Sequence, residues 1–154
     1  VDRMVMSEPV ASRREMATQF GADLLHDPRE SNLQEFIKDH NGGNGANIAA
    51  EAVGQPNLVA KCFEVVRPRG QVLMIGVNPE GAALPVDMYD IHYREITLKG
   101  AFGRGDVFAR TPAEIDTLNL DGVISDHYGL QDVPQAIIDS GEGKGVKFVI
   151  KPHR

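Results

Sequence analysis

The stretch that decides the fold is RPRGQVLMIGV, residues 67–77. A turn of arginine, proline and glycine leads into four consecutive apolar residues, Val72 to Ile75, and the run closes at Gly76 and Val77. Apolar character that is continuous rather than alternating is typical of a parallel strand covered on both faces. The stretch therefore predicts a strand inside a parallel sheet that is flanked by helices.

Strands and helices are expected to alternate along the rest of the chain. Short apolar runs bounded by turn residues predict further strands at 4–6, 24–25, 48–53, 96–102, 123–130 and 146–150. Helical spacing of apolar residues predicts helices at 10–20, 32–40, 56–66 and 133–137, and a helical turn at 88–93. This order predicts an α/β fold with a mostly parallel sheet and helices on both of its faces.

Local signals predict where several helices begin, end or break. Ser31 and Gln34 have the spacing of a capping box, which predicts the start of the second helix. Pro56 fits the first turn of the third helix, where its missing N–H costs little. Pro112 is expected to interrupt a weak helical pattern at 106–119. The predicted buried face of the third helix is Leu58, Val59, Cys62, Val65 and Val66.

The composition excludes several classes of protein. The 154 residues are 42% apolar and 25% charged, which describes a globular chain that can bury a sizeable core. No stretch approaches the roughly 18–20 apolar residues of a membrane span, and a net charge of −6 without a basic block argues against a nucleic-acid partner. Cys62 is the single cysteine, which excludes an internal disulfide and a cysteine-based zinc knuckle. We expect a cytoplasmic protein.

The candidate ligand-binding residues follow the predicted strands, because ligands of open parallel sheets bind at the carboxyl ends of the strands. They are Glu8-Pro9, Val53-Gly54, Ile75-Gly76-Val77 and Ala101-Phe102-Gly103. A carboxylate such as that of Glu8 can accept two hydrogen bonds from a ribose diol, and small residues let a flat ligand approach the backbone. Taken singly, Glu8 is more often a solvated turn residue and the glycines are more often turn formers. The ordered set is the stronger signal.

The sequence predicts no self-contained catalytic or metal site. The phosphate-binding pattern G-x-G-x-x-G follows none of the predicted strands, and the glycines at 141–145 lack its spacing. His92 and His127 have no second ligand at a metal-binding spacing, so both are interpreted as surface or hydrogen-bonded histidines. Cys62 lies on an apolar helix face and is interpreted as an inert core residue.

Several segments, in order, resemble the zinc-type medium-chain dehydrogenases, in the branch of alcohol, polyol and threonine dehydrogenases. They are MVMSEP at 4–9, RR at 13–14, FGAD at 20–23, EAVGQP at 51–56, the stretch at 67–77, REITLKGAF at 94–102 and GKGVKFVIKP at 143–152. The resemblance covers essentially the whole chain and is most specific from Tyr89 to Phe102. It implies an incomplete Rossmann-type, doubly wound coenzyme domain at 1–120 and a C-terminal segment of the catalytic domain at 121–154.

The resemblance also implies coenzyme contacts at matching positions. These are Glu8, Pro9, Arg13, Val53, Gly54, Ile75, Gly76, Val77, Ala101, Phe102 and Lys147. Glu8 would bind the ribose hydroxyls of adenosine and disfavour a 2′-phosphate, which points to NAD, and Arg13 would lie near that ribose. Lys147 falls where a basic residue meets the pyrophosphate. The turn at 53–54 would flank the adenine, and the later turns would line the nicotinamide side.

The implied parent function is the NAD-dependent oxidation of a secondary alcohol or polyol, in which zinc polarises the oxygen while hydride passes to nicotinamide. The family's zinc ligands, proton relay, first Rossmann strand and glycine-rich turn have no match in this sequence. That strand would lie centrally, between residues 3–8 and 47–53. We therefore expect Val1 to be a cut or lost boundary, and the isolated chain to lack dehydrogenase activity. The family also pairs subunits through the strand at 96–101, which implies a homo-oligomer.

Two other functions stay open at this point. The chain is compatible with a non-catalytic nucleotide-binding or assembly module from a truncated gene. Another Rossmann-like class, such as a methyltransferase, also carries an acid after its second strand, although the segments from Tyr89 onward argue against it. The substrate is not defined by this sequence, because the family builds its substrate pocket largely from the half that has no match here.

Overall fold

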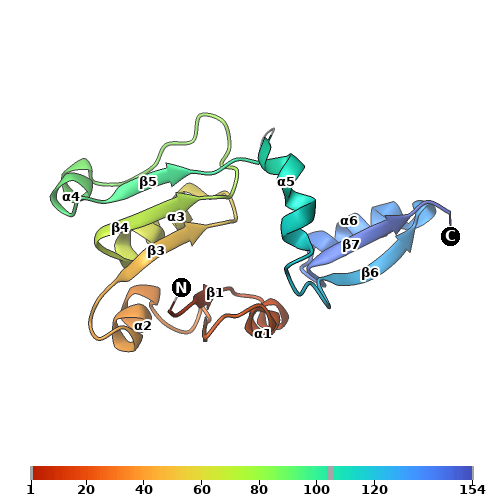
Figure 1. Cartoon of the computed structure of the whole chain (residues 1–154), viewed down its shortest axis with the longest axis horizontal. Helices are drawn as coiled ribbons and strands as arrows, with labels where there is room; N and C mark the ends of the chain where they lie inside the picture. Colours follow the sequence, from red (N-terminus) through yellow and green to blue (C-terminus); the bar gives the residue numbers. More distant parts are fainter. Residues whose placement is uncertain (1, 104–105, 154) are drawn as a thin grey trace. The chain divides into compact units, whose positions relative to one another are not determined.

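The computed structural model describes residues 2–103 and 106–153 (Figure 1). Strands and helices alternate as predicted, and the paired strands of the described ranges are all parallel. Their ladders form three sheets, β1–β2, β3–β4–β5 and β6–β7. The chain divides into two compact units, one from Ser31 to Val107 and the other formed by the segments up to Glu30 and from Phe108 onward.

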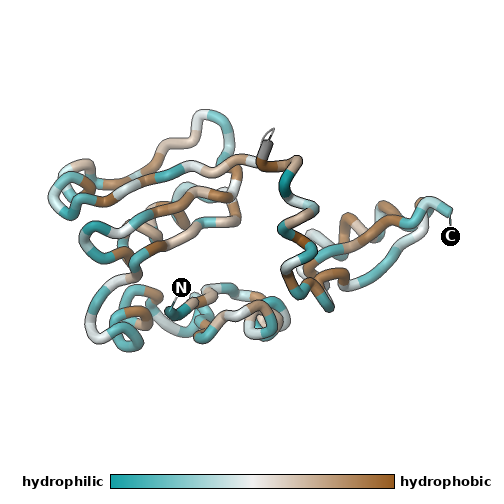
Figure 2. The backbone as a smooth tube through the Cα atoms, in the orientation of Figure 1, coloured by the Kyte–Doolittle hydropathy of each residue, from teal (hydrophilic) through white to brown (hydrophobic). Residues whose placement is uncertain are grey.

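The unit from Ser31 to Val107 is built on a three-stranded sheet. Its strands are β3 (Ala46–Glu51), β4 (Val66–Met74) and β5 (Thr97–Gly100), and helix α3 (Pro56–Val65) connects the first two. β4 lies in the middle, with Val72 opposite Ala49 on one side and Leu98 on the other. Figure 2 shows apolar residues along these strands. The prediction from residues 67–77 of a strand inside a parallel sheet is confirmed.

The core of this unit joins one face of α3 to the sheet. Its buried members are Val59, Cys62, Phe63, Val66, Val72 and Ile96. Val72 is completely buried, which agrees with its place in the central strand. Phe63 was not in the predicted buried face of α3, whereas Leu58, which was, is only half-buried. Burial of these side chains removes apolar surface from water and supplies the main stabilisation of the unit.

Three local predictions in this unit are wrong in detail. The N-cap of α2 (Leu33–His40) is Asn32 rather than Ser31, because the Asn32 carboxamide oxygen accepts from the N–H groups of Gln34 and Glu35 at 2.9 and 3.2 Å. β3 ends two residues early, because the side chain of Glu51 folds back onto the next turn. The turn predicted at 67–70 lies within β4, where the register with β3 shifts.

The predicted helical turn at 88–93 is present as α4 (Met88–Tyr93). Asp87 caps it by accepting from the N–H of Tyr89 at 2.8 Å. Arg94 then binds the Asp90 carboxylate through Nε at 2.9 Å and donates to the carbonyls of Phe63 and Val66 at 2.8 and 2.9 Å. Arg94 therefore fastens α4 to the junction of α3 and β4.

The other unit contains two strand–helix–strand motifs. The first is β1 (Val5–Ser7), α1 (Ala11–Gln19) and β2 (Leu24–His26). The second is β6 (Ile124–Gly129), the short 3-10 helix Leu130–Asp132, α6 (Val133–Gly141) and β7 (Lys147–Lys151). Each motif pairs its two strands in parallel, as the sequence predicts.

Helix α5 (Asp106–Ile115) continues through Pro112, so the predicted interruption is wrong. A proline removes one helical hydrogen bond, and the carbonyl left without that donor belongs to Phe108, a strongly exposed residue. The helix resumes at once, since the Asp116 N–H donates to the Pro112 carbonyl at 3.3 Å. In the described ranges, none of the helices has the length and apolar character to cross a membrane.

Candidate nucleotide-binding rim

The carboxyl ends of β3, β4 and β5 form one rim of the three-stranded sheet, because the strands are parallel. A hollow of about 530 Å³ lies at this rim. Its walls are residues 74–78, residues 82–84, Leu98, residues 100–102, and Pro56 and Val59 of α3. None of these wall residues is charged. The hollow therefore suits an uncharged, flat group and offers no counter-charge to a phosphate.

Three large apolar side chains of this wall are exposed. Ile75 is 50% exposed, Phe102 is 66% exposed and Val77 is 73% exposed. All three were predicted from the sequence as coenzyme contacts. When a ligand or partner covers such an exposed apolar side chain, the burial of its surface lowers the free energy of the complex.

Gly54 and Gly76 pack the turn after β3 directly against the turn after β4. A Cβ on Gly76 would lie 2.1 Å from the backbone nitrogen of Gly54, and a Cβ on Gly54 would lie 2.3 Å from the carbonyl oxygen of Val77. Gly54 also has a φ of +93°. The sequence suggested that small residues here let a ligand approach, and the structure gives them a second purpose, the contact between the two turns.

Glu51 is a residue of this rim that the site prediction omitted. It is the last residue of β3 and only 3% exposed. Its Oε1 accepts from the N–H groups of Val53 and Gly54, each at 2.7 Å. An acid that ends a strand, followed by glycine and then by a proline in a helix's first turn, is the signal that marks such a turn-binding carboxylate.

In the other unit, Glu8 and Pro9 follow β1. Glu8 is half-buried, and its Oε1 accepts from the N–H of Val10 at 2.8 Å, which closes the turn into α1. The Arg13 guanidinium donates to the Gly145 carbonyl at 3.2 Å, two residues before the exposed Lys147 at the start of β7. Glu8, Pro9, Arg13 and Lys147 therefore all lie in this unit. The seven other predicted contacts lie at the rim of the three-stranded sheet, in the unit from Ser31 to Val107.

Cys62 lies in the core of the unit from Ser31 to Val107, as predicted. Burial raises the pKa of its thiol to about 11, and the negative charge of Glu51 adds to this shift. The thiolate is therefore a minor form at neutral pH, which makes Cys62 a poor nucleophile. In the described part of the chain, no three His, Cys, Asp or Glu side chains gather in a metal-binding cluster.

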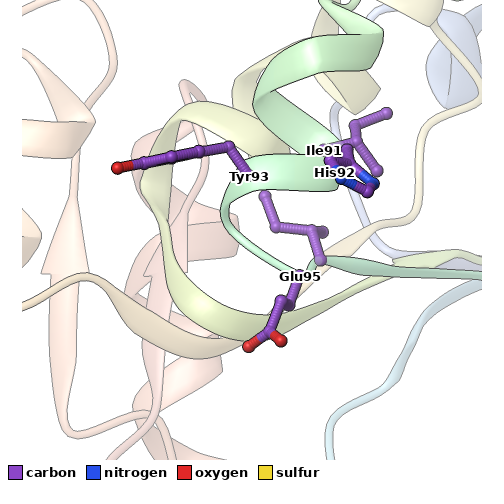
Figure 3. A pocket seen from close by; sticks show the side chains of 5 residues that line it. Ile91, His92, Tyr93 and Glu95 are labelled. Atoms are coloured by element: carbon purple, nitrogen blue, oxygen red, sulfur yellow. The ribbon is translucent and has the colours of Figure 1, made fainter.

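A second, shallower hollow lies beside α4 and is lined by Ile91, His92, Tyr93, Glu95 and Ile96. Figure 3 shows the polar ends of Tyr93 and Glu95 pointing in different directions, with His92 on the other side of the helix from Tyr93. These groups do not converge on a common point. The hollow therefore has no evident ligand, and the rim of the three-stranded sheet is the candidate site.

A comparison with known families decides what this chain is. The profile of the zinc-binding dehydrogenases matches residues 3–120. The chain belongs to the zinc-binding dehydrogenase family. This confirms the resemblance found in the sequence.

Curated relatives of this zinc-binding dehydrogenase chain include enzymes with different substrates. It is 28% identical to the L-threonine 3-dehydrogenase of Thermococcus kodakarensis, over 98% of this chain and 44% of that protein. It is 33% identical to the geraniol dehydrogenase of Castellaniella defragrans, over 97% of this chain and 41% of that protein. The chain spans less than half the length of these relatives.

Solved structures share the fold. A protein of Sinorhizobium meliloti 1021 assigned to the zinc-binding dehydrogenases, in a crystal structure bound to NADP, superposes with a TM-score of 0.89 at 24% identity. That match covers 99% of this chain and 46% of the other. The benzyl alcohol dehydrogenase of Acinetobacter calcoaceticus gives a TM-score of 0.84 at 22% identity, over 98% and 43% of the two chains. The predicted α/β alternation of helices and parallel strands is thereby confirmed.

Proposed function

We propose that this chain is the coenzyme-binding part of a zinc-dependent alcohol or polyol dehydrogenase, and that the uncharged hollow at the rim of the three-stranded sheet receives the nicotinamide ring of NAD. The observation that carries the proposal is the wall itself: it is mostly apolar, it contains no charged residue, and three of its own side chains, Ile75, Val77 and Phe102, are exposed. A flat ring that covers these side chains removes their apolar surface from water.

The adenosine half of NAD is assigned to Glu8 and Arg13. One oxygen of the Glu8 carboxylate already caps the turn at Val10, and its remaining lone pairs are enough for the two hydroxyls of a ribose. A 2′-phosphate at the same place would meet the Glu8 charge at close range, which favours NAD over NADP.

The full reaction requires groups beyond those of this chain. In the complete enzyme, the coenzyme would supply the hydride acceptor and zinc would supply a Lewis acid for the alcohol oxygen. By the same resemblance, the zinc ligands and the proton relay belong to the half of the relatives that this chain does not match. By the same resemblance, Glu8 would orient the ribose, Lys147 would contact the pyrophosphate, and the rim would shield the ring from water.

Titration of the purified chain tests this proposal. The fluorescence of the reduced nicotinamide ring reports the binding of NADH directly. We expect saturable binding of NAD and NADH, weaker binding of NADP, and no NADH production from alcohols or polyols in the presence of zinc. An absence of binding at millimolar NAD would contradict the proposed function, and zinc-dependent turnover would contradict the expected inactivity.

We further propose that two copies associate through β5. All four residues of this strand are exposed, and within the described residues β5 pairs with β4 alone. An edge strand with free N–H and C=O groups is a template for a second strand. Light scattering after size exclusion is expected to give a dimer, and Leu98→Lys, which puts like charges at the contact, is expected to give a monomer. A monomeric parent chain at high concentration would contradict this interface.

A further inference from the structure

We infer that Glu51 is the positioning residue of the rim: its side chain holds the turn after β3, and its main chain holds the turn after β4. The inference deepens the proposed function, because these two turns carry five of the predicted coenzyme contacts. Glu51 is 3% exposed and ends β3, so it reaches both turns from inside the molecule rather than from the ligand side.

The side chain and the main chain of Glu51 bind different turns. Its Oε1 accepts from the N–H groups of Val53 and Gly54 at 2.7 Å each. Its backbone carbonyl accepts from the N–H groups of Ile75 and Gly76 at 2.8 and 3.0 Å. Hydrogen bonds to a carboxylate are stronger than those between neutral groups. One residue therefore fixes the positions of both turns relative to the end of β3.

The contact between Gly54 and Gly76 further restricts the movement of the turn after β3. Because the two backbones already touch, a shift of the Val53–Gly54 turn toward the next strand is blocked, and the Glu51 carboxylate prevents a shift away from it. The turn is thus held from both sides. Val53, which is 66% exposed, and Val77 are carried at fixed positions on the surface of the rim.

The same carboxylate determines which part of a nucleotide this turn accepts. Free N–H groups at a helix N-terminus form an anion site, but here Glu51 Oε1 also lies 3.4 Å from the N–H of Gln55, which precedes α3. The N–H groups of this turn are therefore already bound by the protein's own carboxylate rather than free for a phosphate. The turn is left to an uncharged group, in agreement with the predicted adenine side.

Two substitutions of Glu51 distinguish a role in positioning the turns from a general contribution to the stability of the fold. Glu51→Gln keeps an acceptor at Oε1, and it places an amide at Oε2, which is buried without a hydrogen-bond partner among the described residues. Glu51→Ala removes the acceptor but keeps the backbone carbonyl. The matched control is Val65→Ala, which opens a cavity at the far end of α3, where Val65 is 4% exposed and is the last residue of the helix.

Amide hydrogen exchange of the full chain, resolved by residue, is the primary measurement. In Glu51→Ala we expect the amides of Val53 and Gly54 to exchange about tenfold faster relative to those of Ile75 and Gly76, whose acceptor is unchanged. Glu51→Gln is expected to restore most of this protection. Val65→Ala is expected to lower the unfolding temperature without a selective change at Val53 and Gly54.

Nucleotide affinity is the second measurement, with NAD and ADP-ribose as the probes. Glu51→Ala is expected to weaken both by about tenfold, and Glu51→Gln by much less. Unchanged exchange at Val53 and Gly54 in Glu51→Ala, or uniform loss of protection like that of Val65→Ala, overturns the inference. If the parent chain binds no nucleotide, the proposed function fails, while the exchange data still decide the role of Glu51.

Discussion

Arg69 and Glu95 are the two non-glycine residues with positive φ in the described part of the chain, and they lie side by side. Their φ values are +61° and +53°. Arg69 Nε lies 2.5 Å from Glu95 Oε2, and the Arg69 N–H donates to the carbonyl of Arg94 at 2.7 Å. Two left-handed backbones are thus joined by an ion pair at the end of the sheet opposite to the rim.

This pair predicts that glycine is a better residue than alanine at position 69. Both Arg69→Gly and Arg69→Ala remove the ion pair, which is exposed and contributes little. Only alanine retains the steric cost of a left-handed backbone, which outweighs the extra entropy of unfolded glycine. We expect Arg69→Gly to unfold roughly 2–5 °C above Arg69→Ala in calorimetry. Equal unfolding temperatures would show that this backbone is not strained.

The contact of Gly54 with Gly76 predicts that neither position tolerates a side chain. Gly76→Ala would place a Cβ 2.1 Å from backbone that has no rotamer to change. Overpacking of this kind costs about 1–3 kcal/mol, and the two turns would have to separate, which weakens nucleotide binding. Gly141→Ala is the matched control, since a Cβ there meets nothing within 4 Å and the residue is not among the predicted contacts. Urea unfolding and NADH titration of both variants provide the check, and equal behaviour of the two would contradict the contact.

The sequence predicts the elements of this fold better than it predicts the contacts between turns. The run Val72–Ile75 marks the central strand because burial on both faces leaves a local pattern in the residue types. Helix caps are less certain, since Ser31 and Asn32 are both good caps and the backbone angle of one residue selects between them. The break expected at Pro112 does not occur, because a single missing N–H is tolerated where the helix is exposed.

In the candidate site, too, the location of the rim can be predicted from the sequence, whereas the contacts between its turns cannot. The ends of β3, β4 and β5 meet because parallel strands share an edge, so the order of elements is sufficient to predict the rim. The local pattern at Glu51, an acid before glycine and proline, indicates only the contact with the turn that follows β3. Its second contact, with the turn after β4, joins residues 20 or more positions apart and leaves no local pattern. The close approach of Gly54 and Gly76 is equally hidden, since either glycine alone reads as a turn residue.

Asp139 predicts a pH dependence of stability in the unit that contains β6 and β7. Hydrogen bonds from Lys144 at 2.8 Å, Tyr128 at 2.7 Å and Gln135 at 2.9 Å lower the pKa of its carboxyl from 3.8 to about 2. Because the folded pKa is below the unfolded one, this stabilisation is complete above about pH 4 and is lost as the pH falls toward 2.

Asp139→Asn is therefore expected to flatten the decline of stability between about pH 4 and pH 2 and to destabilise the chain at neutral pH. Asp27, whose pKa is also lowered by its hydrogen bonds to Arg29, supplies an acid-sensitive contribution that this variant keeps. Urea unfolding at several pH values measures the slope, with the exposed Asp116→Asn as control. A parent-like slope in Asp139→Asn would mean that the Lys144–Asp139–Tyr128 network is not formed.

Glu8 gives the last prediction, which concerns the choice between NAD and NADP. Glu8→Gln keeps the oxygen that accepts from the Val10 N–H and removes only the negative charge. If that charge repels a 2′-phosphate, the ratio of NADP to NAD affinity should rise by about tenfold, with little change in stability. Glu8→Ala, which also loses the cap, separates the effect of charge from that of the turn. Titration of all three proteins with both coenzymes decides the matter: tighter NADP binding in the parent chain, or an unchanged ratio in Glu8→Gln, would remove Glu8 from the ribose site.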